Sequence, residues 1–587
     1  ITGYTCSDLF LQEYLLEQAK RALGTIAEET AEVDAILFVG LPLAYNGKLY
    51  NVAAVLCRGE VLGFVPKTYL PNYNEFYEAR HYTSGKNTDF EIEYAGRKTV
   101  LTDKVLFQNK NMPDFTIGVE VCEDLWVAES PSIALAKSGA TVICNPSTSD
   151  DTIGKAEYRR SLVRMQSGKL CCAYIYTDSG FGESTTDTVY SAQNIICENA
   201  SLLSESERFT TGITYADIDV QKLMGERRRM STFCSDNENV RRIYFDMPLT
   251  DTKLSRKFEQ TPFVPSAKDD LSRRCKEIIT MQATGLATRL AHTGIKNVVL
   301  GLSGGLDSTL ALIVCVHAFD MLGIDRKNIH TVTMPCFGTT KRTKSNAEKL
   351  AEAYNVSFEE INITAAVRQH FIDIKHDESV TDITYENSQA RERTKILMNL
   401  SNKYGGLVIG TGDLSELALG WATYNGDHMS MYAVNVSIPK TLVRYLTAYE
   451  AEISEGELKT VLLDVLDTPV SPELLPPDKN GEIAQKTEDV VGPYELHDFF
   501  LYYFVRFGFT PSKIYYLAKH SFAGKYNNDT IKKWLVTFFK RFFSQQFKRS
   551  CLPDGPKVGS VTLSPRSDWR MPSDASVRIW LDELENQ

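Results

Sequence analysis

The segment that most constrains the fold of this chain is Ser-Gly-Gly-Leu-Asp-Ser at residues 303–308. It follows a short apolar run at 297–302 and precedes a second apolar run that begins at Thr309. A short apolar run, a glycine turn and a helical pattern together predict a buried strand that leads directly into a helix. Such units build doubly wound parallel sheets, which bind their ligands at the carboxyl ends of the strands. The sequence therefore predicts a doubly wound parallel sheet in this half of the chain.

The residue types in this loop are suited to binding a pyrophosphate group. Backbone N–H groups and the positive end of the following helix converge there, and Gly304 and Gly305 allow a closer approach than a Cβ would. Ser303 and Ser308 add hydroxyl donors, and Asp307 adds a hard oxygen ligand for Mg²⁺. The lysine of the Walker A loop is missing, so the motif resembles the PP-loop of ATP pyrophosphatases instead. The alternative is an ordinary strand-to-helix turn, which a motif this restrictive disfavours.

The length of the chain, 587 residues, is too great for a single hydrophobic core, so at least two domains are expected. Residues 250–270 are polar, contain two prolines and lack sustained periodicity, which is typical of a linker. We therefore expect an N-terminal domain at 1–249, a linker at 250–270 and a C-terminal domain at 271–587.

Hydrophobic periodicity predicts an α/β architecture in both halves. In the first half, Ser7 and Asp8 are expected to cap a helix. The strands and hairpins expected after it lie at residues 35–41, 49–64, 116–121, 141–144, 171–177 and 192–203. In the second half a helix is expected at 271–291. The strands expected to alternate with helices after it lie near residue 298 and at 329–334, 357–363 and 407–410. The segment 469–486, rich in Pro, Glu and Asp, is expected to be a surface loop.

Composition excludes several broad classes of protein. With 43% hydrophobic and 24% charged residues the chain is an ordinary globular protein, and its net charge of −11 argues against general binding to nucleic acid or anionic membranes. The 12 cysteines are scattered without Cys-x-x-Cys pairs, so neither a zinc site nor a disulfide framework is indicated, and a cytoplasmic location is expected. No apolar run approaches the ~20 residues that a membrane span needs.

A second centre of chemistry is predicted at Cys122, which ends the apolar strand pattern of residues 116–121. A thiol needs a nearby cation or base before it attacks at neutral pH. Lys67, at the end of the 49–64 hairpin, could favour the thiolate and stabilise the oxyanion of a tetrahedral intermediate. A buried structural cysteine is the alternative interpretation of Cys122 taken alone.

Taken together, these segments resemble the nitrilase (carbon–nitrogen hydrolase) superfamily, which uses a Glu–Lys–Cys triad. The resemblance implies an N-terminal α/β/β/α sandwich in which Lys67 and Cys122 are catalytic. Residues 2–4 match the segment just after the triad glutamate, so that glutamate is expected upstream of the first residue. Glu75 or Glu78 is expected as an accessory carboxylate, with solvated acids at a helix start as the alternative.

A second acidic turn follows the expected strand at 407–410. Glu416, in Gly-Thr-Gly-Asp-Leu-Ser-Glu at 410–416, could join Asp307 as a ligand of Mg²⁺. Its alternative role is that of an acid at a helix N-terminus, which the helix dipole favours.

A nitrilase-like domain ahead of a PP-loop domain resembles the arrangement of the glutamine-dependent NAD⁺ synthetases. Five further segments carry the resemblance, at 338–343, 414–421, 427–430, 439–442 and 563–572. The resemblance implies an adenine nucleotide α-hydrolase-like C-terminal domain that adenylates the nicotinate carboxylate of deamido-NAD⁺ with ATP and Mg²⁺. Ammonia from glutamine then displaces AMP, which implies a protected route for ammonia.

The resemblance also assigns binding residues one by one. Those expected to bind glutamine are Tyr73, Ser149 and Lys155. Those expected to bind ATP are Gly301, Leu302, Ser303, Gly304, Gly305, Leu306, Asp307, Ser308 and Thr411. Those expected to bind deamido-NAD⁺ are Asn387, Glu416, Asp427 and Lys548, with Lys557 as a competitor for the last position. Asp307 and Glu416 are the expected metal ligands, and a homo-oligomer such as an octamer is the expected assembly.

Two other functions compete with this interpretation. One is another PP-loop glutamine amidotransferase, such as a GMP synthetase-like ligase, against which the Lys67 and Cys122 segments argue because such a ligase normally pairs with a different glutaminase domain. The other is a non-catalytic nucleotide-binding or scaffold protein.

Overall fold

The computed structural model describes residues 1–235, 240–265, 268–338, 341–468, 474 and 487–586. The chain divides into two compact units, Ile1–Arg256 and Lys257–Gln587. The loop expected at 469–486 lies outside the described residues, apart from Leu474.

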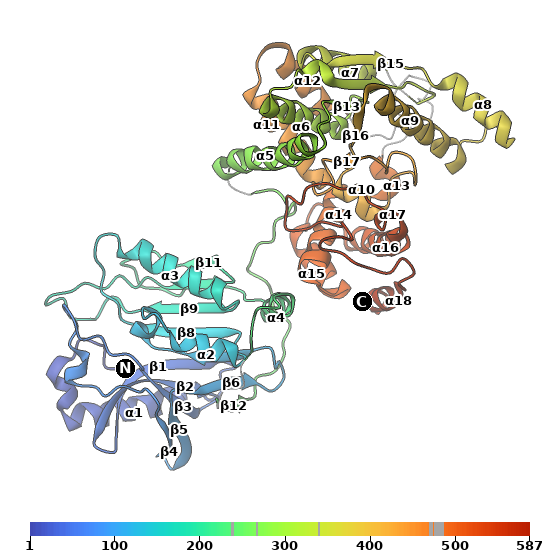
Figure 1. Cartoon of the computed structure of the whole chain (residues 1–587). Coiled ribbons are helices and arrows are strands. Elements are labelled where there is room, and N and C mark those ends of the chain that lie inside the picture. The colour runs from blue at the N-terminus through green and yellow to red at the C-terminus, as the bar shows by residue number, and fades with distance from the viewer. Residues whose placement is uncertain (236–239, 266–267, 339–340, 469–473, 475–486, 587) are drawn as a thin grey trace. The chain divides into compact units, whose positions relative to one another are not determined.

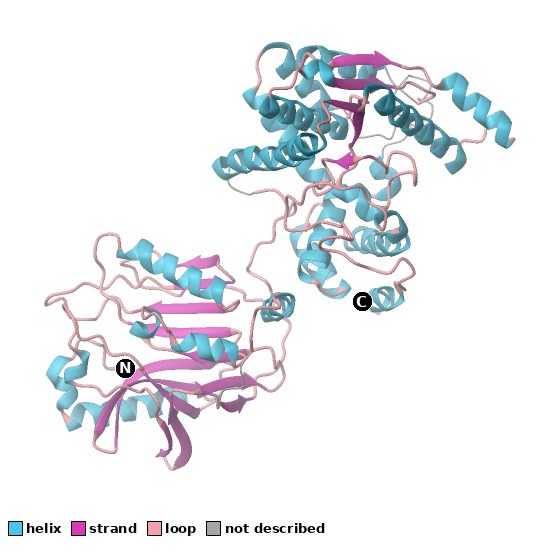
Figure 2. Ribbon diagram, in the orientation of Figure 1, coloured by secondary structure: helices cyan, strands magenta, loops and turns pink. Residues whose placement is uncertain are grey.

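The described residues of the first unit form two β-sheets, one of five strands in the order β1-β2-β3-β5-β4 and one of seven in the order β11-β10-β9-β8-β7-β6-β12 (Figures 1 and 2). The strands are β1 (Ile36–Tyr45), β2 (Lys48–Cys57), β3 (Glu60–Pro66), β4 (Asp89–Tyr94), β5 (Arg97–Thr102), β6 (Val105–Asn109), β7 (Thr116–Val119), β8 (Val142–Ser147), β9 (Ala173–Asp178), β10 (Ile195–Glu198), β11 (Ser201–Glu205) and β12 (Arg241–Phe245). The helices are η1 (Ser7–Leu11), α1 (Glu13–Glu29), η2 (Glu78–Arg80), η3 (Cys122–Leu125), α2 (Pro131–Lys137), α3 (Lys155–Lys169) and α4 (Val220–Arg229).

Strand β2 shows why this unit has four layers. Successive side chains of a strand point to opposite faces of its sheet. Val55 belongs to a core formed with strands of the second sheet, whereas Leu56 belongs to a core shared with Leu23 of α1. A third core joins Leu135 of α2 and Val163 of α3 to the far face of the second sheet. The order of layers is therefore helix, sheet, sheet, helix, which confirms the expected α/β/β/α sandwich (Figure 1).

The expected hairpins at 49–64 and 192–203 are confirmed by the pairing of β2 with β3 and of β10 with β11. The expected helix cap is wrong, because α1 begins at Glu13 after Gln12. Asp8 lies in η1, and its carboxylate accepts hydrogen bonds from Arg80 Nε (2.8 Å) and Nη2 (3.0 Å) instead of capping α1.

In the second unit the described residues form a five-stranded parallel sheet in the order β15-β14-β13-β16-β17. The strands are β13 (Asn297–Gly301), β14 (Ile329–Thr333), β15 (Ser357–Glu360), β16 (Gly406–Gly410) and β17 (Tyr432–Ala433). The helices are α5 (Lys268–Thr293), α6 (Leu306–Leu322), η4 (Arg326–Asn328), α7 (Lys341–Ala353), α8 (Thr364–Ile374), α9 (Ile383–Tyr404), α10 (Leu414–Leu419), α11 (Lys440–Ile453), α12 (Gly456–Asp467), α13 (Thr487–Val491), α14 (Tyr494–Leu501), η5 (Tyr502–Phe507), α15 (Pro511–Ser521), α16 (Asn528–Ser544), α17 (Gln546–Arg549) and α18 (Arg578–Glu585).

Helices cover both faces of this parallel sheet. Val298 of β13 packs in a core with helices α5, α6, α11 and α12, whereas its neighbour Val299 packs on the other face with Val367 of α8 and Tyr385 of α9. Because both faces are buried, the strand is a continuous apolar run, as is usual in parallel sheets. The expected doubly wound sheet is confirmed.

Helices α14 to α17 form an aromatic-rich group that the sequence analysis did not predict. Helix α14 packs against α10 and α11, both of which begin at the carboxyl end of the sheet (Figure 1). It is continued by η5, a π-helix. Within the described part of the chain, no helix combines the length and the apolar character that crossing a membrane requires.

Candidate active sites

Cys122 occupies a sharp turn directly after strand β7. Its φ of +47° lies in the left-handed region, which a residue with a side chain adopts only when its surroundings hold it there. The side chain of Asn145, in the neighbouring strand β8, holds both the backbone N–H and the backbone carbonyl of Cys122. Its Oδ1 accepts from Cys122 N (2.7 Å), and its Nδ2 donates to Cys122 O (3.4 Å). The turn begins η3 and places the thiol beyond the strand end.

Asn145 is in turn held by a buried chain of hydrogen bonds. Its Nδ2 donates to Tyr174 Oη (2.9 Å), whose hydroxyl donates to the carboxylate of Glu120, and Asn145 is only 1% exposed. A mutation at Asn145 therefore removes the two hydrogen bonds that hold the Cys122 backbone and leaves the side chains expected to bind glutamine in place.

We expect Asn145→Ala to lower kcat for glutamine hydrolysis by about 10- to 100-fold, because a misplaced nucleophile loses its alignment with the amide. KM for glutamine should change little, since Asn145 acts through the backbone of Cys122. Steady-state kinetics of glutamate release measures both constants. Asn111→Ala, which removes an exposed amide bonded to Asp246, serves as the matched control. A general loss of fold would also lower synthesis from added ammonium, and that result would contradict a positioning role.

The lysine of the first site is buried against an acid. Lys67 is 1% exposed, and its Nζ donates to Glu78 Oε2 at 2.5 Å. Asn51 Nδ2 donates to the other oxygen of Glu78 at 2.8 Å. Glu75 is exposed, so of the two candidate accessory acids it is Glu78 that the fold brings to the lysine.

Electrostatics couples Lys67 to Cys122. Burial raises the pKa of the Cys122 thiol, and the ammonium of Lys67 offsets part of that rise. Burial by itself would lower the pKa of Lys67, but Cys122 and Glu78 together raise it. At neutral pH the lysine is therefore a cation and the thiol is protonated, so attack needs a base that takes the thiol proton. That is the role of the glutamate in the triad that the nitrilase resemblance implies.

Asp124 ties the cysteine turn to the lysine loop. It accepts from Val121 N (3.0 Å) on one side and from Tyr69 N (2.8 Å) on the other. Burial raises the pKa of Asp124 to about 7. The sequence analysis missed both Asp124 and Asn145, although each stands close to a strand end beside Cys122.

The three residues expected to bind glutamine lie in different surroundings. Tyr73 is exposed, and its hydroxyl donates to Glu123 Oε1 (2.8 Å), next to the nucleophile. Lys155 pairs with Asp150 and lies 5.7 Å from the ring of Trp126. Ser149 follows β8 and is 4% exposed.

The side chain of Ser149 is committed to the protein. Its hydroxyl accepts a hydrogen bond from the buried Arg159 Nη2 (3.1 Å). The contact between this segment and Cys122 is therefore made by the backbone and not by the Ser149 side chain. The adjacent carbonyl of Thr148 accepts from Cys122 Sγ at 3.7 Å.

In the second unit the predicted strand, glycine turn and helix are found at β13, 302–305 and α6. Gly305 is the N-cap of α6. Ser303 Oγ accepts from Gly305 N (3.3 Å) and lies 3.1 Å from Ser308 Oγ, so both hydroxyls gather at the helix N-terminus. Because the first N–H groups of a helix have no partner within it, this end of α6 can bind an anion.

The two glycines of this loop, both of which are expected to admit the anion, have different surroundings. Gly304 has φ +83°, and a Cβ there would lie 2.1 Å from Thr343 O in helix α7. Among the described residues that line the cavity described below, Gly304 is absent whereas Gly305 is present. A Cβ on Gly305 would meet only Ser303 Oγ, at 3.4 Å. Gly304 is thus required by packing against α7, and Gly305 faces the cavity.

We expect Gly304→Ala and Gly305→Ala to fail in different assays. Gly304→Ala forces a strained φ and a clash with backbone, so its stability should fall by ~2 kcal/mol or more, measured by thermal unfolding. Gly305→Ala should unfold close to wild type but bind ATP at least several-fold more weakly, measured by calorimetry. If Gly304→Ala were fully stable, the assignment of Gly304 to packing would be wrong.

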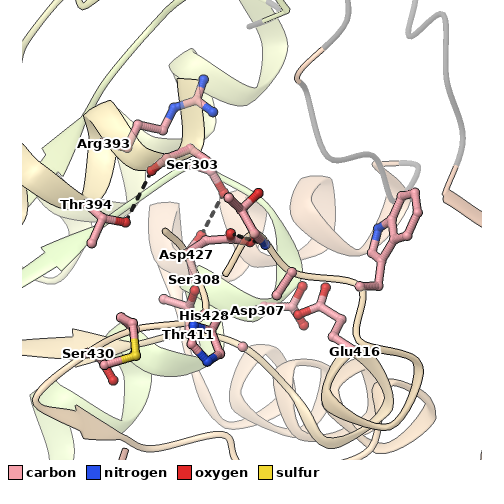
Figure 3. Close-up of a pocket in the computed structure, with 18 of the residues that line it drawn as sticks. Ser303, Asp307, Ser308, Arg393, Thr394, Thr411, Glu416, Asp427, His428 and Ser430 are labelled. Atoms are coloured by element: carbon pink, nitrogen blue, oxygen red, sulfur yellow. Dashed lines mark hydrogen bonds between the residues drawn. The ribbon is translucent and has the colours of Figure 1, made fainter. Parts of the chain in front are cut away.

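Helix α6 opens into a cavity of about 750 Å³ at the carboxyl end of the parallel sheet (Figure 3). Every residue expected to bind ATP, apart from Gly304, lines it, and so do all four expected to bind deamido-NAD⁺, namely Asn387, Glu416, Asp427 and Lys548. Lys557 is not among the described residues that line it and pairs with Asp568 (2.8 Å). Of the two competing lysines, the fold therefore brings Lys548 to the cavity.

The residues expected to bind deamido-NAD⁺ are linked by hydrogen bonds to one segment of the cavity wall. Thr423 Oγ1 donates to Asn387 Oδ1 (2.7 Å), and Thr423 N donates to Asp427 Oδ1 (2.8 Å). Lys548 Nζ donates to the carbonyls of Gly420 (2.8 Å) and Ala422 (2.7 Å). Asn387, Asp427 and Lys548 thus come from three separate segments and are joined through residues 420–423.

Three carboxyl groups gather at the start of α6. Asp307, Asp413 and Glu416 each offer one oxygen, and these oxygens lie within 4.8 Å of one another. Figure 3 shows Asp307 and Glu416 side by side. Asp413 and Glu416 form a capping box at the start of α10, with Asp413 Oδ1 accepting from Glu416 N (2.9 Å). Burial raises the pKa of Glu416 to about 7 even though the nearby ammonium of Lys440 opposes that shift.

Lys440 stands among these acids. From the sequence it is expected only as part of the segment 439–442, without a role of its own. Its Nζ lies 2.6 Å from Asp307 Oδ2, 2.6 Å from Asp413 Oδ2 and 2.9 Å from Glu416 Oε1. Asp307 Oδ1 is buried and has no hydrogen-bond partner within the described residues. Hard oxygen donors, one of them unpartnered, fit a divalent cation such as Mg²⁺.

Comparisons with known proteins match each of the two units to a family. Residues 1–228 match the carbon-nitrogen hydrolase family and residues 278–514 match the NAD synthase family. The chain is 44% identical to a glutamine-dependent NAD(+) synthetase of Mycobacterium tuberculosis (strain ATCC 25618 / H37Rv), over 100% of this chain and 92% of that protein. It is 29% identical to a glutamine-dependent NAD(+) synthetase of Aquifex aeolicus (strain VF5), over 97% of this chain and 91% of that protein. A crystal structure of a glutamine-dependent NAD(+) synthetase from Cytophaga hutchinsonii aligns over 100% of this chain and 92% of that one, with 22% identity and a TM-score of 0.45.

Proposed function

The chain belongs to the glutamine-dependent NAD⁺ synthetases, and on that premise we propose how its two units divide the reaction. The enzyme amidates deamido-NAD⁺ to NAD⁺ at the expense of ATP, with nitrogen from glutamine. The first unit releases ammonia from the glutamine side chain. The second activates the nicotinate carboxylate and transfers the ammonia to it.

In the first unit, Cys122 Sγ attacks the side-chain amide of glutamine. A base takes the thiol proton, and the proton passes to the leaving nitrogen, so that ammonia departs and a thioester remains. Water then hydrolyses the thioester to glutamate and restores the thiol. The ammonium of Lys67, held by Glu78, stabilises the oxyanion that forms in both steps. Tyr73, Ser149 and Lys155 are the proposed glutamine contacts.

In the second unit, an oxygen of the nicotinate carboxylate attacks the α-phosphorus of ATP and pyrophosphate leaves. Ammonia then attacks the activated carbonyl, and AMP leaves with the bonding electrons. The N-terminus of α6 and the hydroxyls of Ser303 and Ser308 bind the departing pyrophosphate, whose negative charge the helix dipole stabilises. Asn387, Asp427 and Lys548, which line the same cavity, are the proposed contacts of deamido-NAD⁺.

Asp307 and Glu416 are the residues that would hold Mg²⁺ in this unit. A magnesium ion bound there would neutralise charge on the phosphates. A homo-oligomer such as an octamer stays a prediction of the family resemblance, and a cytoplasmic location stays a prediction from the pattern of cysteines.

The observation that carries this proposal is the presence of a Cys122–Lys67 centre and a cavity at the α6 N-terminus in one chain, which is 44% identical over its full length to a glutamine-dependent NAD(+) synthetase. The test supplies the full chain with ATP, Mg²⁺ and glutamine or ammonium chloride, and offers deamido-NAD⁺ or xanthosine monophosphate as acceptor. We expect AMP, pyrophosphate and NAD⁺ in equal amounts with deamido-NAD⁺ only. Amidation of xanthosine monophosphate alone would support a GMP synthetase-like ligase, and ATP binding without product would support a non-catalytic protein.

A further inference from the structure

The lysine at the centre of the carboxylate cluster is unusually placed for a group beside a divalent metal site. Lys440 is 6% exposed, and its Nζ contacts one oxygen of each of the three acids. The ring of Tyr494 closes the other side, 5.4 Å from Nζ. A cation at this spot is enclosed by oxygens and an aromatic face, much as a bound metal ion is enclosed by its ligands.

The backbone of Lys440 is anchored independently of its side chain. Lys440 N donates to Ser415 Oγ (2.8 Å). The neighbouring Thr441 donates to the buried Asp498 through its N (3.0 Å) and its Oγ1 (2.6 Å), and Ser415 Oγ donates to the same carboxylate. The ammonium thus sits on a flexible four-carbon stem whose base is anchored by α14.

Three buried polar atoms at the cluster have no hydrogen-bond partner within the described residues. They are Asp307 Oδ1, Asp413 Oδ2 and the hydroxyl of Tyr494, a residue that is 3% exposed. Of the two carboxyl oxygens, Asp413 Oδ2 is in ion-pair contact with Lys440 Nζ, which leaves Asp307 Oδ1 as the unused one. Three carboxyl groups face this one lysine. A site with an unused oxygen can take a further cation, but a divalent ion at Asp307 and Glu416 would lie against the ammonium and repel it.

We propose that Lys440 is an internal counter-cation that competes with the divalent metal for Asp307 and Glu416, and that it must leave these oxygens when the metal binds. The proposal rests on the proposed function only for the identity of the metal site. In the absence of nucleotide the lysine keeps the three acids paired and metal affinity low. Phosphate groups entering the cavity offer the displaced ammonium a new anion, so nucleotide and metal bind together more readily than the metal alone.

The first test measures Mn²⁺ binding to the full chain by electron paramagnetic resonance at pH 8, without nucleotide or deamido-NAD⁺. Lys440→Met should bind Mn²⁺ roughly tenfold more tightly than wild type, or better, because a competing charge is removed from the ligands. Lys525→Met, which removes an exposed lysine paired with Glu495, should bind as wild type does. Equal or weaker binding by Lys440→Met would overturn the proposal.

A double variant tests whether Mn²⁺ binds at this cluster. Adding Glu416→Gln to Lys440→Met should abolish most of the gain, since Glu416 is a ligand shared by both cations. A gain that survives this change would mean that Mn²⁺ binds elsewhere, which would also overturn the proposal.

The second test uses the wild-type chain and so does not depend on the folding of a variant. Reductive methylation followed by peptide mass spectrometry reports how accessible each lysine is. Modification of Lys440 should rise several-fold when Mn²⁺ is saturating, whereas that of the exposed Lys525 should not change. No rise at Lys440 would show that the ammonium stays in place. Because neither test involves NAD⁺ synthesis, both can succeed even if the proposed function fails.

Discussion

Cys122→Ala is expected to lower glutamine-dependent NAD⁺ synthesis by at least about 10³-fold and to leave ammonium-dependent synthesis within about twofold of wild type. In the proposed mechanism Sγ is the atom that forms a covalent bond with the amide carbon, so no neighbouring side chain can replace it. The second unit receives the same ammonia whether it is generated by the first unit or added from outside. NAD⁺ formation with each nitrogen source, quantified by chromatography, measures both effects.

The matched control for this change is Cys234→Ala, which removes an exposed thiol in the same unit. It should leave synthesis from both nitrogen sources unchanged. Loss of both activities in Cys122→Ala, with a normal thermal unfolding curve, would contradict the division of labour between the two units.

Asp307→Asn is expected to remove NAD⁺ synthesis from both nitrogen sources, by at least about 10²-fold, while hydrolysis of glutamine continues. Asp307 stands at the first turn of α6 between the phosphate loop and Lys440. The amide has nearly the same shape but neither binds a divalent cation well nor balances the charge of the lysine. Pyrophosphate release with ammonium chloride as nitrogen source measures the loss directly.

Asp320→Asn tests the same substitution at the other end of the same helix, where Asp320 pairs with Arg326 (2.7 Å) at the surface. A surface ion pair of this kind contributes ~1 kcal/mol or less, so this variant should remain active. If Asp307→Asn kept ammonium-dependent synthesis, the carboxylate could not be required for adenylation. Cys122→Ala thus tests the role of the first unit in glutamine hydrolysis, and Asp307→Asn tests the role of the second unit in adenylation.

Much of the fold could be predicted because its signals are local. The hairpin at 49–64 turns at Arg58 and Gly59, both of which adopt positive φ, and the apolar run at 297–302 is a strand buried on both faces. Each signal is carried by a few consecutive residues. The helix cap at Ser7 and Asp8 failed for the opposite reason, since Asp8 is used by Arg80, which is distant in the sequence.

The candidate sites divide in the same way. The segments with Cys122 and with residues 303–308 could be located from their own residue pattern. The choice of Glu78 over Glu75, and of Lys548 over Lys557, needed the three-dimensional arrangement, because it depends on which side chain reaches Lys67 or the cavity.

The sequence by itself determined the two types of chemistry and their order along the chain, because a nucleophile turn and a phosphate loop are short segments with their own geometry. Only the tertiary structure decided how Gly304 differs from Gly305, why Cys122 can hold its left-handed conformation, and which cation lies between Asp307 and Glu416. Each of these depends on an atom from another segment, namely Thr343 O, Asn145 Oδ1 and Lys440 Nζ. Close packing and charge pairing between distant segments are properties of the folded chain, which local patterns do not encode.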